Sequence, residues 1–286
     1  MIRTTELAPA ARGRLDGEAL IAFLGVRAVP GVERFDGQTY QRALKLARGS
    51  AVVQLTPHGD AVRCGLQLER PEDEAEALAR CRRLLDLDTD LTAVEVQLSG
   101  DSVLGPLVKR RPGLRVPCTV DGFELAVRAV VGQQVSVAGA RAVLGRLAAI
   151  YGEPFAGAGG LDRHFPSPAA LAEADPAGMP FPRARGEALR SLARLAIEGR
   201  LNLDPGADAA SARASLLDIR GVGPWTASYI GMRALGDRDA WLPRDVGLRN
   251  ALERLGQPGG ERAALRLSEL WRPWRSYAVM HLWATL

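Results

Sequence analysis

The sequence predicts an α+β fold, in which a small domain with an antiparallel sheet and helices precedes an all-helical domain. Between residues 29 and 69, short alternating segments are separated by turn signals such as Asp36-Gly37. After Pro112, strand signals nearly vanish and apolar residues recur at helical spacing. The length of 286 residues allows two domains. We therefore expect an N-terminal domain at 1–112 and a helical domain at 113–286.

In chain order, the alternating region at 29–69 predicts four short antiparallel strands. The stretch EDEAEALARCRRLLDL then predicts a helix at 72–87, and a second helix is expected at 101–109, ending at KRRPG. The Gly- and Pro-rich stretch YGEPFAGAGGLDRHFPSP connects two later helices. In the helical domain, helices are predicted at 122–131, 135–150, 168–174, 184–198, 208–219, 225–235, 245–255, 260–270 and 274–285.

The composition, 47% hydrophobic and 24% charged residues, is that of a soluble globular protein. There is neither an apolar run of membrane-spanning length nor a signal peptide at the N-terminus, so we expect a cytoplasmic protein without a membrane partner. Three cysteines and three histidines are widely scattered, which fits neither a disulfide framework nor a metal site. The 37 basic residues include only two lysines; arginine suits phosphate, although a GC-rich genome also favours it.

The segment LDIRGVGPWTASY, at 217–229, predicts two helices joined by a very tight turn. Gly221 and Gly223 permit backbone conformations that other residues adopt poorly, and Pro224 suits the first position of the second helix. The N-terminus of that helix presents free N–H groups and a positive dipole end, which suit a DNA phosphate. The alternative is a glycine-rich packing turn between two helices.

The whole segment resembles the helix-hairpin-helix motif, which holds a DNA phosphate without reading base sequence. Three further stretches, GFELAVRAVVGQQVS, WLPRDVGLRNAL and WRPWRSYAVMHLW, extend the resemblance to the helix-hairpin-helix DNA glycosylases. The pattern is most similar to the bacterial AlkA-type 3-methyladenine DNA glycosylase II branch. The stretch FLGVRAVPGVERFDGQTYQRALKL also resembles the N-terminal domain of that branch. The family implies a monomer that acts on double-stranded DNA containing alkylated bases, associated with the nucleoid when acting.

The resemblance makes Asp245 the catalytic residue, because N-glycosidic cleavage builds positive charge on the sugar that a carboxylate can stabilise. The alternative is a plain helix N-cap, and both roles can hold together. A flipped base needs a pocket. By resemblance the pocket residues are Phe23, Trp225, Tyr229 and Trp283, whose faces could hold a cationic base, although aromatic residues at helical spacing usually form core.

The family also implies DNA contacts at Gly221, Gly223 and Thr226. It implies a possible monovalent cation, Na⁺ or K⁺, on the carbonyl groups of Leu217, Ile219 and Val222, with no other cofactor required. Family members place a bulky apolar side chain at the position that fills the space left by the flipped base, and this chain has Gln134 there. A glutamine can still fill the space, although it could be an ordinary surface residue.

Three further departures from the family pattern refine this picture. Related enzymes that cut the strand use a lysine where this chain has Trp225, and no lysine follows Lys109, so we expect a monofunctional glycosylase without lyase activity. Val246 and Ala284 stand where tyrosines are common, which predicts a roomier pocket.

The leading hypothesis is excision of 3-methyladenine, with 7-methylguanine, 1-methyladenine or ethenoadenine as further substrates, in base excision repair. The alternative is a non-catalytic helix-hairpin-helix protein that binds damaged DNA; Asp245 and the aromatic pocket discriminate, because a pure binder needs neither. A third possibility keeps the mechanism but accepts deaminated or oxidised bases.

Overall fold

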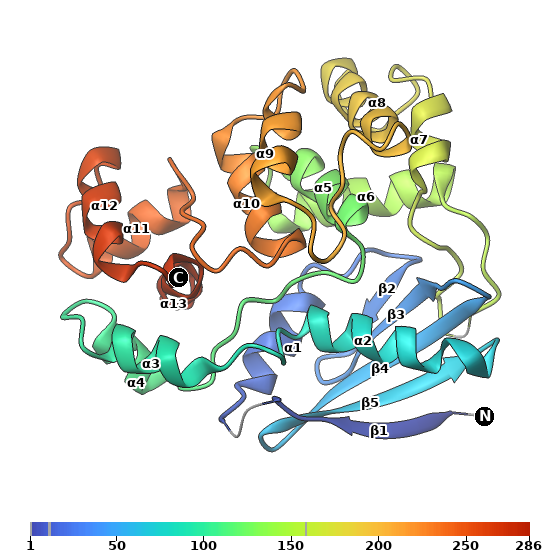
Figure 1. Cartoon of the computed structure of the whole chain (residues 1–286). Helices are drawn as coiled ribbons and strands as arrows, with labels where there is room; N and C mark the ends of the chain where they lie inside the picture. The colour runs from blue at the N-terminus through green and yellow to red at the C-terminus, as the bar shows by residue number, and fades with distance from the viewer. Residues whose placement is uncertain (1, 11–12, 158) are drawn as a thin grey trace.

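The computed structural model describes residues 2–10, 13–157 and 159–286. A five-stranded antiparallel sheet lies beside an assembly of helices, with α1 between the sheet and the C-terminal helices (Figure 1). This confirms the α+β class. The strand order is β1-β5-β4-β3-β2. The strands are β1 (Arg3–Leu7), β2 (Glu33–Phe35), β3 (Tyr40–Lys45), β4 (Ser50–His58) and β5 (Ala61–Leu68).

The turn signals in the sequence correctly located the hairpins of the sheet. His58 pairs with Ala61, so Gly59 and Asp60 form a two-residue turn in which Gly59 has a φ of +59°. The sequence analysis missed β1, which pairs with β5 at the sheet edge. The first four residues of β1 are exposed, so this strand lacks the alternation that identifies a strand with one buried face.

Two helices pack with the sheet around one hydrophobic core. In α1 (Gly17–Gly25), Leu20 and Ile21 are buried in the same cluster as Leu55 of β4, and α2 (Glu74–Leu84) adds further apolar side chains. The sequence analysis missed α1 and also α3 (Leu91–Ser99). Each begins at an aspartate N-cap, Asp16 and Asp90, a signal that could have identified them.

The remaining helices form two further cores. One is built by the helices from α5 to α10, and the other joins α3 and α4 to the helices from α11 to α13 around the fully buried Trp271. The predicted division at residue 112 therefore runs through a shared core.

The helices are α4 (Gly105–Arg110), α5 (Gly122–Val131), α6 (Val137–Tyr151), α7 (Pro168–Glu173), α8 (Arg183–Ile197), α9 (Ala209–Leu217), α10 (Pro224–Ala234), α11 (Val246–Arg254), α12 (Glu261–Ser268) and α13 (Arg275–Trp283).

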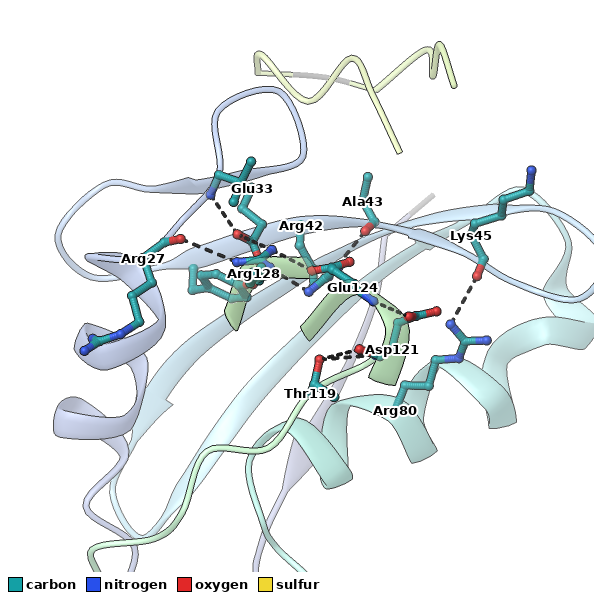
Figure 2. Close-up of polar contacts among 12 residues, drawn as sticks. Arg27, Glu33, Arg42, Ala43, Lys45, Arg80, Thr119, Asp121, Glu124 and Arg128 are labelled. Atoms are coloured by element: carbon teal, nitrogen blue, oxygen red, sulfur yellow. Dashed lines mark hydrogen bonds and ion pairs between the residues drawn. The ribbon is translucent and has the colours of Figure 1, made fainter. Parts of the chain in front are cut away.

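A buried ionic network, defined here as Glu33, Arg42, Glu124 and Arg128, joins the sheet to α5 (Figure 2). Arg42 bonds Glu33 at 3.2 Å and Glu124 at 2.9 Å. Arg128 bonds the same two carboxylates at 2.8 and 2.5 Å. Burial alone would raise the pKa of Glu124, but the two guanidinium groups outweigh it and lower that pKa. The network fixes the sheet against the helical part.

His281 on α13 is a buried group that should make the fold sensitive to acid. Only 4% of it is exposed, and burial lowers its pKa to about 4. Between pH 6.5 and pH 4 the unfolded chain therefore binds a proton that the folded chain does not, so stability is full above this window and falls as the pH drops through it. His164, whose pKa burial also lowers, acts in the same direction.

We expect the free energy of unfolding to fall by roughly 2 kcal/mol between pH 7 and pH 5 on account of His281. Urea unfolding at both pH values measures this loss, and His281→Phe should remove most of it while retaining the ring volume. An unchanged pH dependence in the variant would show that His281 does not cause the loss.

None of the described helices has both the length and the apolar character needed to span a membrane.

Candidate active site

Asp245 lies at the N-terminus of α11, where its side chain caps the helix. Its Oδ1 accepts a hydrogen bond from the backbone N–H of Leu248 at 2.7 Å. The same carboxylate accepts the indole N–H of Trp283 at 3.0 Å and that of Trp225 at 2.8 Å. Three N–H donors thus hold one carboxylate in place. The N-cap interpretation is correct, and it is compatible with a chemical role.

The residue two positions after Asp245 is Gly247, where a side chain would crowd the carboxylate. A β-carbon on Gly247 would lie 3.1 Å from Asp245 Oδ1 and 3.1 Å from Trp283 Nε1. The glycine therefore allows the indole and the carboxylate to meet. The sequence analysis did not single out Gly247, because its role depends on a contact with a residue 36 positions away.

The four predicted pocket aromatics and Asp245 line one cavity of about 690 Å³. Trp225 and Tyr229 are stacked on α10, with ring centroids 5.2 Å apart and planes 7° apart. The ring of Trp283 lies 6.4 Å from that of Tyr229, and Phe23 reaches the cavity from α1. All four also pack against the C-terminal core. The same rings thus serve as core packing and as the lining of an open cavity.

Positions 246 and 284, where the family commonly has tyrosines, differ in their placement. Ala284 lines the cavity, where its small side chain leaves space. Val246 is 58% exposed and is not part of the cavity lining.

Several arginines line the cavity, and two of them, Arg27 and Arg233, lie beside its aromatic rings. Arg233 donates to the Tyr229 hydroxyl at 2.6 Å and to the carbonyl of Cys118 at 3.1 Å. The guanidinium of Arg27 lies 3.6 Å from the centroid of the Phe23 ring. Burial lowers the pKa of Arg27 to about 10, so it remains a cation at neutral pH. The cavity thus combines one carboxylate at its aromatic end with guanidinium groups beside Phe23 and Tyr229.

The predicted hairpin is present between α9 and α10. Gly221 has a φ of +92°, in the left-handed region that favours glycine. Gly223 is the N-cap of α10 and has no side chain to cap the first turn, and Pro224 occupies the first helical position. No heavy atom lies near the point that a β-carbon on Gly223 would occupy. The N-terminus of α10 is therefore open to an approaching group.

The loop that carries Gln134 is fixed to this hairpin. The side-chain amide of Gln133 donates to Thr226 Oγ1 at 2.9 Å and to the carbonyl of Gly221 at 3.1 Å. Thr226 is only 3% exposed, so its hydroxyl holds the loop rather than facing solvent. Gln134 is exposed and has a φ of +58°, which is uncommon for a residue with a side chain. The anchoring residue is Gln133, which the sequence analysis did not single out.

The three carbonyl groups predicted to hold a monovalent cation all belong to the hairpin region. The carbonyl of Ile219 accepts the N–H of Val222 at 2.9 Å, which leaves a second lone pair free. Oxygen donors at the end of a helix suit a hard cation. Among the described residues, no cluster of three or more His, Cys, Asp or Glu could hold a metal ion.

The chain is similar to known proteins along most of its length. The family model described as the AlkA N-terminal domain matches residues 6–121. The "Probable bifunctional transcriptional activator/DNA repair enzyme AlkA" of Mycobacterium tuberculosis is 47% identical over 270 residues, 94% of this chain and 54% of that protein. The chain thus spans about half the length of that relative.

A second relative matches over nearly its full length. "DNA-3-methyladenine glycosylase 2" of Escherichia coli is 38% identical over 285 residues, with 94% of each chain covered. Among solved structures, the 3-methyladenine DNA-glycosylase from Archaeoglobus fulgidus has a TM-score of 0.82 at 20% identity. That match covers 99% of this chain and 97% of the other.

Proposed function

The chain belongs to the AlkA family of DNA-3-methyladenine glycosylases, and from this premise we propose that it excises alkylated bases from double-stranded DNA by hydrolysing the N-glycosidic bond. The observation that carries the proposal is the Asp245 carboxylate, fixed by the indole N–H groups of Trp225 and Trp283 at the edge of an aromatic cavity. Such a carboxylate, held in place before reaction, can stabilise charge that develops on a deoxyribose.

In the proposed reaction, the damaged nucleotide rotates out of the duplex and its base enters the cavity. As the C1′–N bond breaks, its electron pair leaves with the base and positive charge develops on the sugar beside Asp245. A water oxygen then bonds to C1′, and Asp245 accepts one of the water protons. A purine methylated at a ring nitrogen carries positive charge before cleavage and departs neutral, so modest electrostatic help suffices.

The cavity volume and the alanine at position 284 support a substrate range that extends beyond 3-methyladenine to 7-methylguanine, 1-methyladenine or ethenoadenine. The open N-terminus of α10 supports contact of Gly221 and Gly223 with a DNA phosphate, and exposed Gln134 supports a role in filling the vacated space. A monovalent cation held by the carbonyls of Leu217, Ile219 and Val222 would add positive charge beside that phosphate.

We expect no covalent intermediate with DNA. Trp225 occupies the position of the lysine that forms a Schiff base in related lyases, and Lys45 and Lys109, the only lysines, lie outside the described cavity lining. Borohydride reduction of a reaction with an alkylated duplex should therefore trap no protein–DNA adduct, and the product should be an intact abasic strand. A trapped adduct would show that an amine of this protein attacks C1′.

The direct test is incubation of the protein with methylated genomic DNA, followed by mass spectrometry of the released bases. Free 3-methyladenine, with 7-methylguanine in addition, is the expected result. Tight binding to damaged duplex without base release would instead support the non-catalytic alternative. Release of only deaminated or oxidised bases would keep the mechanism but assign a different pocket specificity.

A further inference from the structure

The cavity has a cationic side that the excision of cationic bases does not require. Arg27 and Arg233 both line it, and their guanidinium carbons lie 3.6 and 5.0 Å from the centroid of the Phe23 ring. Arg233 also lies 5.6 Å from the centroid of Tyr229. Cations of the protein thus already occupy positions beside two of the four pocket rings. A positively charged base placed there would meet like charges rather than free aromatic faces.

Arg27 has unused hydrogen-bonding capacity toward the cavity. A guanidinium carries five N–H donors. One of them, on Nη1, bonds the carbonyl of Phe23 at 3.0 Å, and no other described residue accepts a hydrogen bond from the Arg27 side chain. Arg233 differs, because all three of its nitrogens bond protein oxygens. Arg27 is therefore a cavity cation beside the pocket rings that can bond a ligand without losing a partner in the protein.

The backbone of Arg27 is held by the buried ionic network. Arg128 Nη1 lies 3.5 Å from the Arg27 carbonyl, and the N–H of Val29 donates to Glu33 Oε2 at 2.7 Å (Figure 2). Both contacts fix the chain directly after α1. The network thereby orients the segment that presents Arg27 and Phe23 to the cavity, which is the kind of support that a positioned binding group needs.

The charge of the departing base decides what such a cation can do. A base methylated to a cation leaves as a neutral molecule and gains nothing from a guanidinium. A neutral damaged base leaves with the electron pair of the C1′–N bond and becomes an anion until solvent supplies a proton. A fixed guanidinium beside that base stabilises the developing negative charge. Water adds to C1′ and Asp245 takes its proton, as in the reaction above.

We propose that Arg27 is a specificity-determining residue that enables the pocket to excise neutral damaged bases with acceptor atoms, by stabilising the anion that leaves. This inference rests on the proposed glycosylase function. The substrates that depend on Arg27 are neutral purines with a ring carbonyl or unprotonated ring nitrogen facing its guanidinium. Hypoxanthine in a duplex is the probe for this class.

The test compares single-turnover excision of hypoxanthine and of 7-methylguanine from otherwise identical duplexes. Arg27→Gln removes the charge, and Arg27→Lys is the matched control that retains it. The ratio of the hypoxanthine rate to the 7-methylguanine rate should fall at least about tenfold in Arg27→Gln and less than about threefold in Arg27→Lys. The ratio is informative because general damage to the pocket slows both reactions equally and therefore leaves the ratio of their rates unchanged.

An unchanged ratio in Arg27→Gln, or a wild-type protein that excises 7-methylguanine but not hypoxanthine, would overturn the role of Arg27 alone. Release of neither base by the wild type would instead overturn the proposed function. Urea unfolding establishes that each variant is folded. Should Arg27→Gln fail to fold, Arg27→Met takes its place, because its unbranched side chain preserves apolar packing on Phe23 without a charge.

Discussion

Replacing Asp245 with asparagine is expected to lower the single-turnover rate of base excision by on the order of a thousandfold or more. The reason is electrostatic, because the neutral amide cannot stabilise the positive charge that develops on the sugar. DNA binding should change less than about threefold, since Asp245 does not belong to the hairpin. Excision from a 7-methylguanine duplex measures the rate, and fluorescence anisotropy with the same duplex measures the affinity.

The substitution is well suited to separate chemistry from folding. Asparagine caps helices about as well as aspartate, so the bond to the N–H of Leu248 and the start of α11 should survive. Asp237→Asn is a matched control, because it removes an exposed carboxylate from the loop that leads to α11. Wild-type turnover by Asp245→Asn, or an equal loss in Asp237→Asn, would refute the role of this carboxylate.

Placing a negative charge at the N-cap of α10 is expected to weaken DNA binding by about a hundredfold. Gly223→Asp should fit, because no heavy atom lies near the position of the new β-carbon, and aspartate is a favoured N-cap. The variant should therefore be at least as stable as the wild type. Its carboxylate, however, occupies the end of the helix that is proposed to hold a phosphate.

Gly223→Asn is the control for this variant, since it has the same shape and capping ability without the charge. It should lose less than about tenfold in affinity, and the difference between the two variants should shrink as the salt concentration rises. Anisotropy titrations at several salt concentrations, with thermal unfolding as the stability measurement, provide both quantities. Equal affinities for the two variants would mean that no phosphate approaches the N-terminus of α10.

The features that the sequence could predict are those with local signatures. Gly221 and Pro224 mark the hairpin because each residue's own backbone preference fits its place, and Asp245 follows Pro243 where a helix had to begin. The turns of the sheet were identified in the same way. In each case the cause lies within a few residues along the chain.

The features that the sequence analysis missed depend on contacts between distant segments. Strand β1 is defined by pairing with β5, and Gly247 by its contact with Trp283. Arg27 is one of 37 basic residues, and nothing in its neighbourhood along the chain distinguishes it from the others; the fold sets it apart by placing it with Arg233 beside the Phe23 ring. Thr226 also depends on a distant contact: it is a buried hairpin residue whose hydroxyl accepts a hydrogen bond from Gln133, far away in the sequence.

Asp245 is expected to face the sugar of an extruded nucleotide, which a crystal structure of this protein with a duplex containing a cationic pyrrolidine abasic analogue would reveal. The analogue's ring nitrogen should lie roughly 3 Å from a carboxylate oxygen of Asp245, with Trp225 and Trp283 still donating to that carboxylate. A carboxylate turned toward solvent, or a nucleotide held elsewhere in the cavity, would contradict it.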